Sequence, residues 1–411
     1  MKITSVEVMR INSAADMTGG KGDPFNGKKP VQKKKGGWHP IIVRINTDEG
    51  IYGYGEVALA YGVGCDAGFG MAKDLAAMII GMDPMDNEAI WHKMRTKTFW
   101  GLAGGAVVFA GMSGIDMALW DIKGKALGVP LYVLLGGKCR EDLRCYASQI
   151  QFDWGVQGNV LIDPQQYAEA ALKAVADGYD AVKVDALEFD PEGRMKALNL
   201  RGPLSLPVIN MAVARVEAIR EAVGDGVDII IENHGETDVV SAIQYAKALE
   251  PYGIYFYEEV VGPMNPAMHR EMKEKVNIPI AGGERIFSRW GYAPFFADRS
   301  LDVIQPDLGT CGGITEGKKI CDMAHTYDMT VQTHVCGSPI YKAASLHLEI
   351  AIPNFCIHEH HRVSLLPENI AMCKYDYQPV NGRYKVPELP GIGQELTEET
   401  YQNAYKEVVT G

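Results

Sequence analysis

Three short apolar runs in the middle of the chain each end in an acid, and these acids are Glu232, Glu258 and Glu284. If the runs are parallel strands of one sheet, their carboxyl ends meet and the three carboxylates converge. Converging carboxylates repel one another, and a hard cation with oxygen ligands relieves that repulsion. We therefore predict a Mg²⁺ site on these three glutamates, with the adjoining Glu259 in a salt bridge or a supporting contact.

Two further apolar runs end in Asp307 and in His334. A carboxylate bonded to one imidazole nitrogen fixes the tautomer and leaves the other nitrogen to act as a base. This predicts His334 as the group that removes a proton, oriented by Asp307. His234 follows Glu232 by two residues, which on an extended strand places both side chains on one face. His234 is therefore a second candidate acid or base.

The last apolar run leads to Glu359, whose carboxyl could be kept neutral by its surroundings and donate to negative charge developing on a substrate. Lys183 and Asp185 share one face of another predicted strand. They could pair with each other or contact the substrate, and both interpretations stay open. Arg285, directly after Glu284, could likewise pair with nearby acids or bind substrate.

The elements that must position these residues begin at about residue 142, where β-rich runs alternate with helical segments. The predicted strands are residues 142–150, 181–185, 228–232, 254–258, 278–282, 302–305, 329–334 and 355–359. The predicted helices are residues 164–177, 207–223, 237–249, 264–274, 288–297, 314–327 and 338–350. Repeated βα units of this number predict an α/β fold with a (β/α)8 barrel of the TIM type. An open doubly wound sheet is the alternative, but no Gly-rich dinucleotide fingerprint follows a strand.

An α+β unit precedes the barrel and is predicted to cap it. It combines an alternating strand, a hairpin and three helices, at residues 2–11, 41–45, 51–56, 67–80, 86–97 and 106–127. The tail after about residue 375 is expected to fold back onto this cap. We therefore expect a capping domain at residues 1–137 completed by 376–411, and a catalytic barrel at 138–375.

A Lys-rich loop at residues 14–39 is a candidate lid over the barrel mouth. Lys33, Lys34, Lys35, Trp38 and His39 could meet the distal end of a substrate there, which makes His39 a candidate binding residue. The alternative is an ordinary solvated loop. The long polar segment 186–206, between a strand and its helix, is also of the kind that carries function.

The net charge, the longest uncharged run and the cysteines limit the classes of protein to which this chain could belong. The net charge of −12 over 411 residues argues against a nucleic-acid partner. The longest uncharged run, which ends at Ile115, is Gly-rich and shorter than the ~20 residues that a membrane span needs. The eight cysteines form no CxxC pair and no signal peptide is visible, which predicts reduced thiols and a cytoplasmic location.

Several motifs together resemble the enolase superfamily, mandelate-racemase subgroup, over nearly the whole chain. They are Gly53-Tyr54-Gly55-Glu56, Asp116 to Asp121, Leu134-Leu135-Gly136-Gly137, Ala281 to Arg289, Ile304 to Leu308 and Gly312 to Glu316. Within that subgroup the chain is similar to acid-sugar dehydratases of the D-galactonate dehydratase type. The Glu232-x-His234 pattern also matches dehydratases of galactonate and mannonate.

The resemblance implies a role for each matching position. It implies Mg²⁺ on Glu232, Glu258 and Glu284, a base or acid at His334 oriented by Asp307, an acid at His234, and a donor to the substrate carboxylate at Glu359. Two positions depart from the pattern. The first metal ligand is usually Asp where this chain has Glu232, and Asp185 stands where many relatives have the second lysine of a Lys-x-Lys pair.

These observations predict a Mg²⁺-dependent dehydratase of a small sugar acid, an aldonate or an aldarate. It would remove the proton alpha to the carboxylate and expel the β-hydroxyl to give a 2-keto-3-deoxy acid. A racemase or epimerase, a lactone cycloisomerase, and a non-catalytic protein that binds a sugar acid are the alternatives. The resemblance also implies a homo-oligomer.

Overall fold

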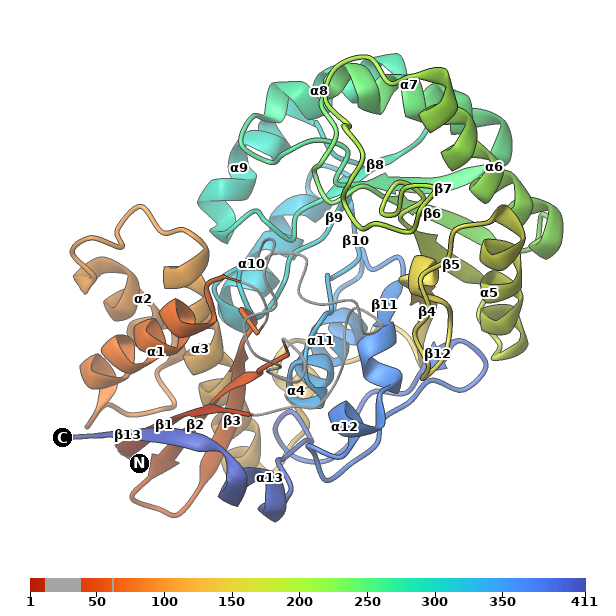
Figure 1. Ribbon diagram of the computed structural model, residues 1–411. Helices are drawn as coiled ribbons and strands as arrows, with labels where there is room; N and C mark the ends of the chain where they lie inside the picture. Colours follow the sequence, from red (N-terminus) through yellow and green to blue (C-terminus); the bar gives the residue numbers. More distant parts are fainter. Residues whose placement is uncertain (12–37, 61–62) are drawn as a thin grey trace.

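The computed structural model describes residues 1–11, 38–60 and 63–411, so the lysines of the candidate lid lie outside the described residues. The N-terminal sheet has four antiparallel strands in the order β13-β1-β2-β3. Their bounds are β1 (Ile3–Arg10), β2 (Ile41–Thr47), β3 (Tyr52–Val57) and β13 (Tyr405–Thr410). Figure 1 shows β13, from the end of the chain, beside β1 from its start. The predicted return of the tail onto the cap is confirmed.

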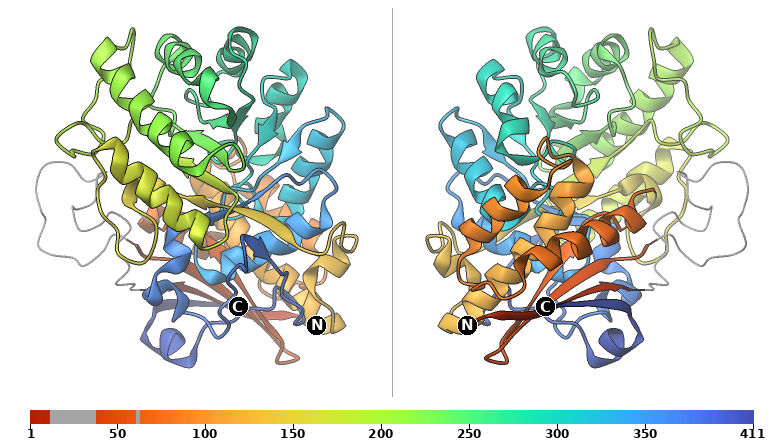
Figure 2. Two further views of the ribbon diagram at one scale, coloured as in Figure 1. Left: turned by 90° about the vertical axis from the view of Figure 1, so that its right-hand side faces the viewer. Right: turned by 90° about the vertical axis from the view of Figure 1, so that its left-hand side faces the viewer.

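Two helices pack on this sheet, α1 (Cys65–Ile79) and α3 (Ala106–Leu127), and α2 (Asn87–Lys97) packs against both of them. Helix α3 lies directly on β3 because Gly53 and Gly55 carry no side chain. A Cβ at either glycine would collide with a carbonyl oxygen of α3, at Ala118 or Gly114. Both chain ends lie at the edge of the N-terminal sheet (Figure 2).

The second sheet is the predicted barrel. Its parallel strands follow the order β10-β9-β8-β7-β6-β5-β4-β11. They are β4 (Leu143–Ser148), β5 (Ala181–Val184), β6 (Asp228–Glu232), β7 (Ile254–Glu258), β8 (Ile280–Gly282), β9 (Val303–Ile304), β10 (Thr330–Val331) and β11 (His358–His361). A parallel bridge between Val331 and Phe355 joins β10 to the segment leading into β11 and closes the ring.

Seven helices connect these strands, as predicted, and Figure 1 shows α5 to α9 in an arc outside them. They are α5 (Pro164–Ala176), α6 (Leu206–Val223), α7 (Val239–Leu249), α8 (Pro266–Lys275), α9 (Ser288–Asp298), α10 (Gly313–His325) and α11 (Pro339–Ala351). Shorter elements are α4 (Leu131–Leu134), α12 (Pro367–Ile370), β12 (Arg383–Tyr384) and α13 (Glu398–Asn403). The α/β barrel with an N-terminal capping unit is confirmed.

Side chains inside the barrel form an apolar layer, to which almost every strand contributes one residue. This layer consists of Tyr146, Ala181, Ile230, Phe256, Ala281, Val303 and Ile357. Because side chains on one face of a strand recur every two residues, the next inward layer lies at the carboxyl ends. It is polar, and its members are Ser148, Lys183, Glu232, Glu258, Gln305 and Glu359. The barrel core thus ends in a charged layer at its mouth.

Two smaller sequence predictions are also tested. All eight cysteines are free, as expected for reduced thiols. No helix in the described parts of the chain is both long and apolar enough to cross a membrane. Trp38, assigned to the candidate lid, is instead fully buried as part of the main hydrophobic core.

Candidate active site at the carboxyl ends of the barrel strands

The charged layer at the barrel mouth is organised around Lys183 on β5. Its Nζ lies 2.9 Å from Glu232, 2.8 Å from Glu258 and 3.0 Å from Glu359. All four side chains are buried, with about 1% of each exposed. Ser148 Oγ also donates to Glu359 Oε1 (2.8 Å). A buried ammonium therefore holds three carboxylates from different strands together.

These charges set the protonation of the cluster. Burial by itself raises the pKa of Glu359, but the Lys183 and His334 charges bring it down to about 2. Burial also opposes ionisation of Glu232, yet His234 and Lys183 hold its pKa well below the ordinary value. Burial and the Glu232 charge raise the pKa of Glu258 well above its usual range. The Lys183 charge thus favours the ionised form of Glu359, whereas the sequence analysis considered a neutral carboxyl there.

Lys183 does not pair with Asp185, one of the two interpretations left open by the sequence. The lysine turns toward the three glutamates, whereas Asp185 Oδ2 lies 2.9 Å from His234 Nδ1. Strand β5 ends at Val184, so Asp185 has left the strand and no longer shares its alternation with Lys183.

His334 and Asp307 meet as predicted, with 2.7 Å between His334 Nδ1 and Asp307 Oδ2. The other ring nitrogen, Nε2, lies 3.3 Å from Glu284 Oε2. Burial lowers the pKa of the imidazole, but the Glu284 and Asp307 carboxylates raise it to about 10. The sequence neighbour Arg285 pairs with Glu259 and, at 2.6 Å, with Glu284. Glu259 thus makes the salt bridge that the sequence predicted.

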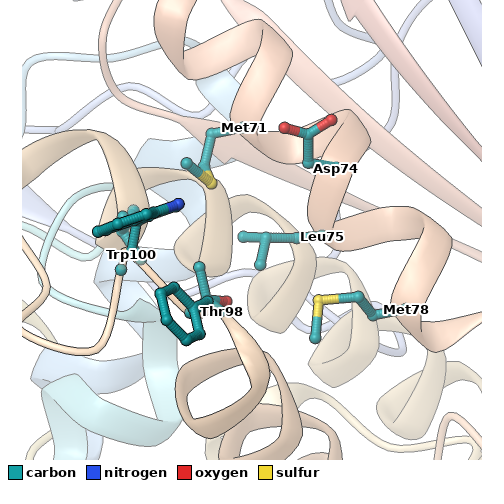
Figure 3. A pocket seen from close by; sticks show the side chains of 9 residues that line it. Met71, Asp74, Leu75, Met78, Thr98 and Trp100 are labelled. Atoms are coloured by element: carbon teal, nitrogen blue, oxygen red, sulfur yellow. The ribbon is translucent and has the colours of Figure 1, made fainter.

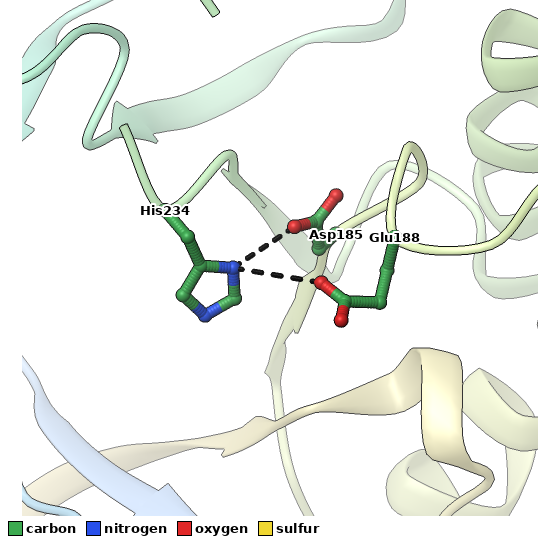
Figure 4. A group of neighbouring side chains, drawn as sticks. All are labelled: Asp185, Glu188 and His234. Carbon is green, nitrogen blue, oxygen red and sulfur yellow. Dashed lines mark hydrogen bonds and ion pairs between the residues drawn. The ribbon is translucent and has the colours of Figure 1, made fainter. Parts of the chain in front are cut away.

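His234 sits in a second imidazole–carboxylate cluster, drawn in Figure 4. Its Nδ1 contacts Asp185 at 2.9 Å and Glu188 Oε2 at 3.8 Å. Burial lowers its pKa, but the charges of Glu232, Asp185 and Glu188 raise it to about 10. Burial and the Asp185 charge raise the pKa of Glu188 to about 8.

The backbone at His234 differs from the predicted extended strand. β6 ends at Glu232, and His234 adopts φ +49°, a left-handed conformation that non-glycine residues rarely take. His234 N donates to Glu232 Oε1 (3.0 Å) across this turn. The two residues are neighbours because the chain turns back, not because they share a strand face. Backbone strain of this kind is concentrated at functional sites.

Among the described residues, one group brings its ligand atoms close enough together for a divalent cation. Ligand atoms of Asp185, Glu188 and His234 all lie within 4.8 Å of one another, so this group could bind a metal ion. The predicted ligands do not form such a group, because Glu232 and Glu258 converge on Lys183 whereas Glu284 contacts Arg285 and His334. Glu258 Oε2 is nonetheless buried without a hydrogen-bond partner. Burial raises the pKa of Glu284 as well. This excess of buried carboxylate oxygen fits a hard cation.

His39 lies at the start of the cap, where its backbone N donates to Ala60 O (2.7 Å). Its predicted contact with substrate is not tested by this arrangement. A separate pocket opens on the cap between α1 and the segment before α3 (Figure 3). It is lined by Met71, Asp74, Leu75, Met78, Thr98, Phe99, Trp100, Gly101 and Val108. Asp74 is its one ionisable lining residue, so this pocket offers no acid–base pair.

Glu188 is the site residue that the sequence analysis did not single out. It stands three residues after Asp185, in the polar segment 186–206 that was noted for its length. Hydrogen bonds fasten this segment over the His234 turn: Arg201 donates to Thr237 O (3.1 Å) and Gly202 N to Asp238 Oδ2 (2.6 Å). The unusual length of this segment was therefore the sequence feature that could have identified Glu188 as a site residue.

Comparisons with known proteins identify the family to which the chain belongs. Residues 31–136 match the mandelate racemase/muconate lactonizing enzyme N-terminal domain, and residues 166–400 match the enolase C-terminal domain-like family. A D-galactonate dehydratase of Pectobacterium atrosepticum is 33% identical over 371 residues, covering 87% of this chain and 89% of the relative. A D-xylonate dehydratase of Haloferax volcanii is 34% identical over 359 residues, covering 87% of this chain and 83% of the relative.

Solved structures extend the likeness to the whole chain. A member of the enolase superfamily from Salmonella Typhimurium is 57% identical, with a TM-score of 0.92 and full coverage of both chains. The two family matches together span the cap and the barrel, and the acids at consecutive strand ends lie within the second. The chain belongs to the enolase superfamily and is related to its acid-sugar dehydratases.

Proposed function

We propose that this protein is a Mg²⁺-dependent dehydratase of sugar acids. It removes the proton alpha to the substrate carboxylate and expels the β-hydroxyl as water, and the resulting enol becomes a 2-keto-3-deoxy acid. The relatives named D-galactonate dehydratase and D-xylonate dehydratase support this reaction class. At about one-third identity they leave the particular sugar acid open, so the substrate is proposed only as a class.

The observation that carries the proposal is the presence of two imidazole–carboxylate pairs in one barrel mouth. His334 with Asp307 follows β10, and His234 with Asp185 follows β6. β6 and β10 are four places apart in a ring of eight strands, so the two pairs lie across the barrel from each other. Dehydration needs one group to take a proton and another to give one to the leaving hydroxyl.

We assign proton removal to His334, whose Nδ1 is held by Asp307 and whose Nε2 points toward Glu284. Burial lowers the pKa of His334 but the Glu284 charge raises it, and a cation bound to that carboxylate would offset this charge and so favour the neutral imidazole that a base requires. We assign protonation of the leaving hydroxyl to His234, which the surrounding carboxylates favour in its charged form. His334 could then return a proton at C3. Each such general acid–base step contributes about 10²–10⁴-fold to the rate.

Glu232, Glu258 and Glu284 would hold the Mg²⁺ ion in this proposal. Bound there, the ion would supply positive charge that stabilises negative charge on the substrate carboxylate. Lys183 keeps Glu232 and Glu359 ionised, and its ammonium is itself a donor beside the proposed substrate carboxylate. We propose that Lys183 donates the hydrogen bond to that carboxylate and that Glu359, ionised beside it, orients the ammonium.

Arg285, Asp185 and His39 are the remaining proposed binding residues. Arg285 is bound to Glu259 and Glu284 at the rim and is 43% exposed, so a second substrate carboxylate could compete for it. Asp185 acts through His234 in this arrangement. His39, near the start of the described cap after the gap at residues 12–37, is proposed to meet the distal end of the substrate.

Epimerisation is the second candidate, because acid–base groups on both sides of the mouth would also serve proton transfer at C2. Proton NMR in D₂O, with Mg²⁺ and a panel of aldonates and aldarates, separates the two reactions. Dehydration gives the signals of a 2-keto-3-deoxy product with deuterium at C3. Epimerisation gives deuterium at C2 without loss of water.

Two variants sharpen this experiment. The His334→Asn variant is expected to lose both product formation and exchange at C2. The His234→Asn variant is expected to lose elimination while retaining exchange at C2, because proton removal precedes departure of the hydroxyl. Elimination at the wild-type rate in His334→Asn would refute the assigned base. Binding of a sugar acid without any exchange would favour the non-catalytic alternative.

Three accompanying proposals concern organisation. We propose a capping domain at residues 1–137 and 376–411 around a barrel at 138–375, a homo-oligomeric assembly and a cytoplasmic location. Limited proteolysis tests the boundary, light scattering the assembly, and fractionation of cells the location.

A further inference from the structure

The loop between β9 and α10 carries Asp307, and the loop between β10 and α11 carries His334. The cap supplies hydrogen-bond acceptors for the first N–H groups of both helices. The N-cap residue of α10 is Gly312, which has no side-chain oxygen. In its place, Asp116 of α3 accepts hydrogen bonds from Thr315 N (2.9 Å) and Thr315 Oγ1 (2.6 Å). Ser113, also in α3, accepts from Gly312 N (3.0 Å).

The N-terminus of α11 is held in the same way by the end of β3. Glu56 accepts hydrogen bonds from Ser338 N (3.1 Å) and from the Ser338 hydroxyl. Ser338 is the N-cap residue of α11, and its Oγ accepts in turn from Ile340 N (3.2 Å). Glu56 and Asp116 are both fully buried. Burying a carboxylate costs free energy unless donors such as these satisfy its oxygens. Loss of either set of hydrogen bonds would therefore be unfavourable.

Short connections link these helix ends to the proposed base and its partner. Gly309 N donates to Asp307 Oδ1 (2.7 Å), and Gly309 O accepts from Ala58 N (3.1 Å) of the cap. The hydroxyl of Tyr341, in the first turn of α11, donates a hydrogen bond to the backbone carbonyl of His334. A shift of either helix end would therefore move Asp307 or His334.

We propose that Glu56 and Asp116 are positioning residues of the His334–Asp307 pair, through which the cap sets the geometry of the proposed base. The inference rests on the proposed function, in which His334 removes the substrate proton. Neither carboxylate touches the reacting groups. Each holds the beginning of a barrel helix whose preceding loop carries one member of the pair.

A structural role alone would make both residues important for stability, so a matched control is needed. Asp121 is a third fully buried carboxylate, five residues after Asp116 in α3. It accepts from Tyr54 N (2.9 Å) and Ile392 N (2.9 Å), and thus joins the cap sheet to the C-terminal segment. Asp121 itself contacts neither helix start; its neighbour Ile392 meets α11 at His347, more than two turns after the helix begins.

The test compares Glu56→Ala, Asp116→Ala and Asp121→Ala in the full chain with Mg²⁺, on whichever sugar acid the wild type converts. Because small misplacements of reacting groups cost up to ~10²-fold in rate, we expect the first two variants to lower kcat roughly tenfold or more. KM should stay near the wild-type value. Asp121→Ala should keep kcat within about twofold of wild type, even if it destabilises the fold to the same extent.

A readout without turnover makes the inference independent of the proposed reaction. In protein labelled with ¹⁵N-histidine, His334→Asn identifies the ring signals of His334. Glu56→Ala and Asp116→Ala are expected to shift these signals, and Asp121→Ala is expected to leave them in place. Should the alanine variants fail to fold, Ser338→Ala and Thr315→Val remove single hydroxyl partners and should give weaker shifts in the same direction.

The outcomes are distinct. Unchanged His334 signals in both cap variants, or a loss of kcat no larger than that of Asp121→Ala, would overturn the inference while leaving the dehydratase proposal intact. A wild type that converts no sugar acid would refute the proposed function, and the ring signals would still decide whether the cap positions His334.

Discussion

Replacement of Lys183 by methionine tests the electrostatic account of the barrel mouth. Lys183 is 1% exposed and forms ion pairs of 2.8–3.0 Å with Glu232, Glu258 and Glu359. Methionine has a similar length but no charge, so it fills the space while leaving the carboxylates without their cation. In EDTA at neutral pH we expect a large decrease in the free energy of unfolding.

The magnitude follows from the burial of all four partners. Removing one partner of a buried ion pair costs about 3–5 kcal/mol, because the remaining charge stays desolvated and unpaired. The total stability of a typical protein is only about 5–15 kcal/mol, so the effect should be obvious in urea denaturation. Added Mg²⁺ should offset part of the loss if it binds the same carboxylates.

The pH dependence has a definite sign. The pKa of Glu359 is lowered to about 2, so its ion pair contributes stability above the ordinary pKa of 4.5, and that contribution is lost as the pH falls toward 2. Lys183→Met has already lost this contribution. The difference in unfolding free energy between wild type and variant should therefore be largest near pH 7 and shrink on acidification.

Lys342 provides a matched control, since it is also buried, with 3% exposed. Its Nζ donates to Tyr377 O (2.8 Å), a neutral carbonyl oxygen in place of a carboxylate. Burial lowers its pKa to about 8 from 10.5, which at 1.36 kcal/mol per pKa unit is a cost of about 3 kcal/mol near pH 7. That cost disappears only above the unfolded pKa, so Lys342→Met should be neutral or stabilising at pH 7.

Urea denaturation followed by circular dichroism, at pH 3 and pH 7.5 and with EDTA or Mg²⁺, measures the free energy of unfolding under all four conditions. The reasoning fails if Lys183→Met changes the unfolding free energy by less than about 1 kcal/mol at pH 7.5 in EDTA, well below the cost of breaking a buried pair. It also fails if Lys342→Met destabilises the protein as much as Lys183→Met does.

Three further predictions concern the scaffold. Burial lowers the pKa of His269 to about 4, so stability present above pH 6.5 is lost as the pH falls toward 4; thermal melts should show a smaller loss in His269→Phe. Asp238→Ala removes acceptors for the first turn of α7 and for Gly202 N, which should cost about 1–2 kcal/mol in urea denaturation and speed proteolysis within residues 186–206. Gly55→Ala would drive a Cβ into the α3 backbone and should sharply lower the yield of folded protein, whereas Gly70→Ala, with open space around it, should not.

Most of the fold could be predicted from the sequence because its signals are local. Apolar runs such as 229–231, which continue without interruption, are typical of strands buried on both faces. The helices between them showed their own periodicity, and the structure confirms all seven at nearly the predicted bounds. The β2–β3 hairpin and the return of the tail to β1 are also confirmed.

The candidate site was predictable to the extent that strand ends define it. Acids that follow consecutive parallel strands must lie at one end of a barrel, whatever the packing of the helices outside. The meeting of His334 with Asp307 follows from the same rule, since β9 and β10 are neighbours. The type and order of residues along the chain therefore determined which groups could gather at the mouth.

Only the tertiary structure decided how these groups interact. Lys183 pairs with Glu232, Glu258 and Glu359 rather than with Asp185, and its charge favours the ionised form of Glu359. The partners lie 49, 75 and 176 residues from the lysine, so no local pattern records them.

Nothing in the sequence indicated that Glu56 contacts the start of α11 or that Asp116 contacts the start of α10. Both residues nevertheless lie in motifs that the sequence analysis identified. The sequence by itself determined the elements and the chemistry available at their ends, because hydrogen bonding and side-chain alternation are short-range. Protonation states and cap contacts arise from burial and from charges brought together across the chain, and those exist only once the molecule has folded.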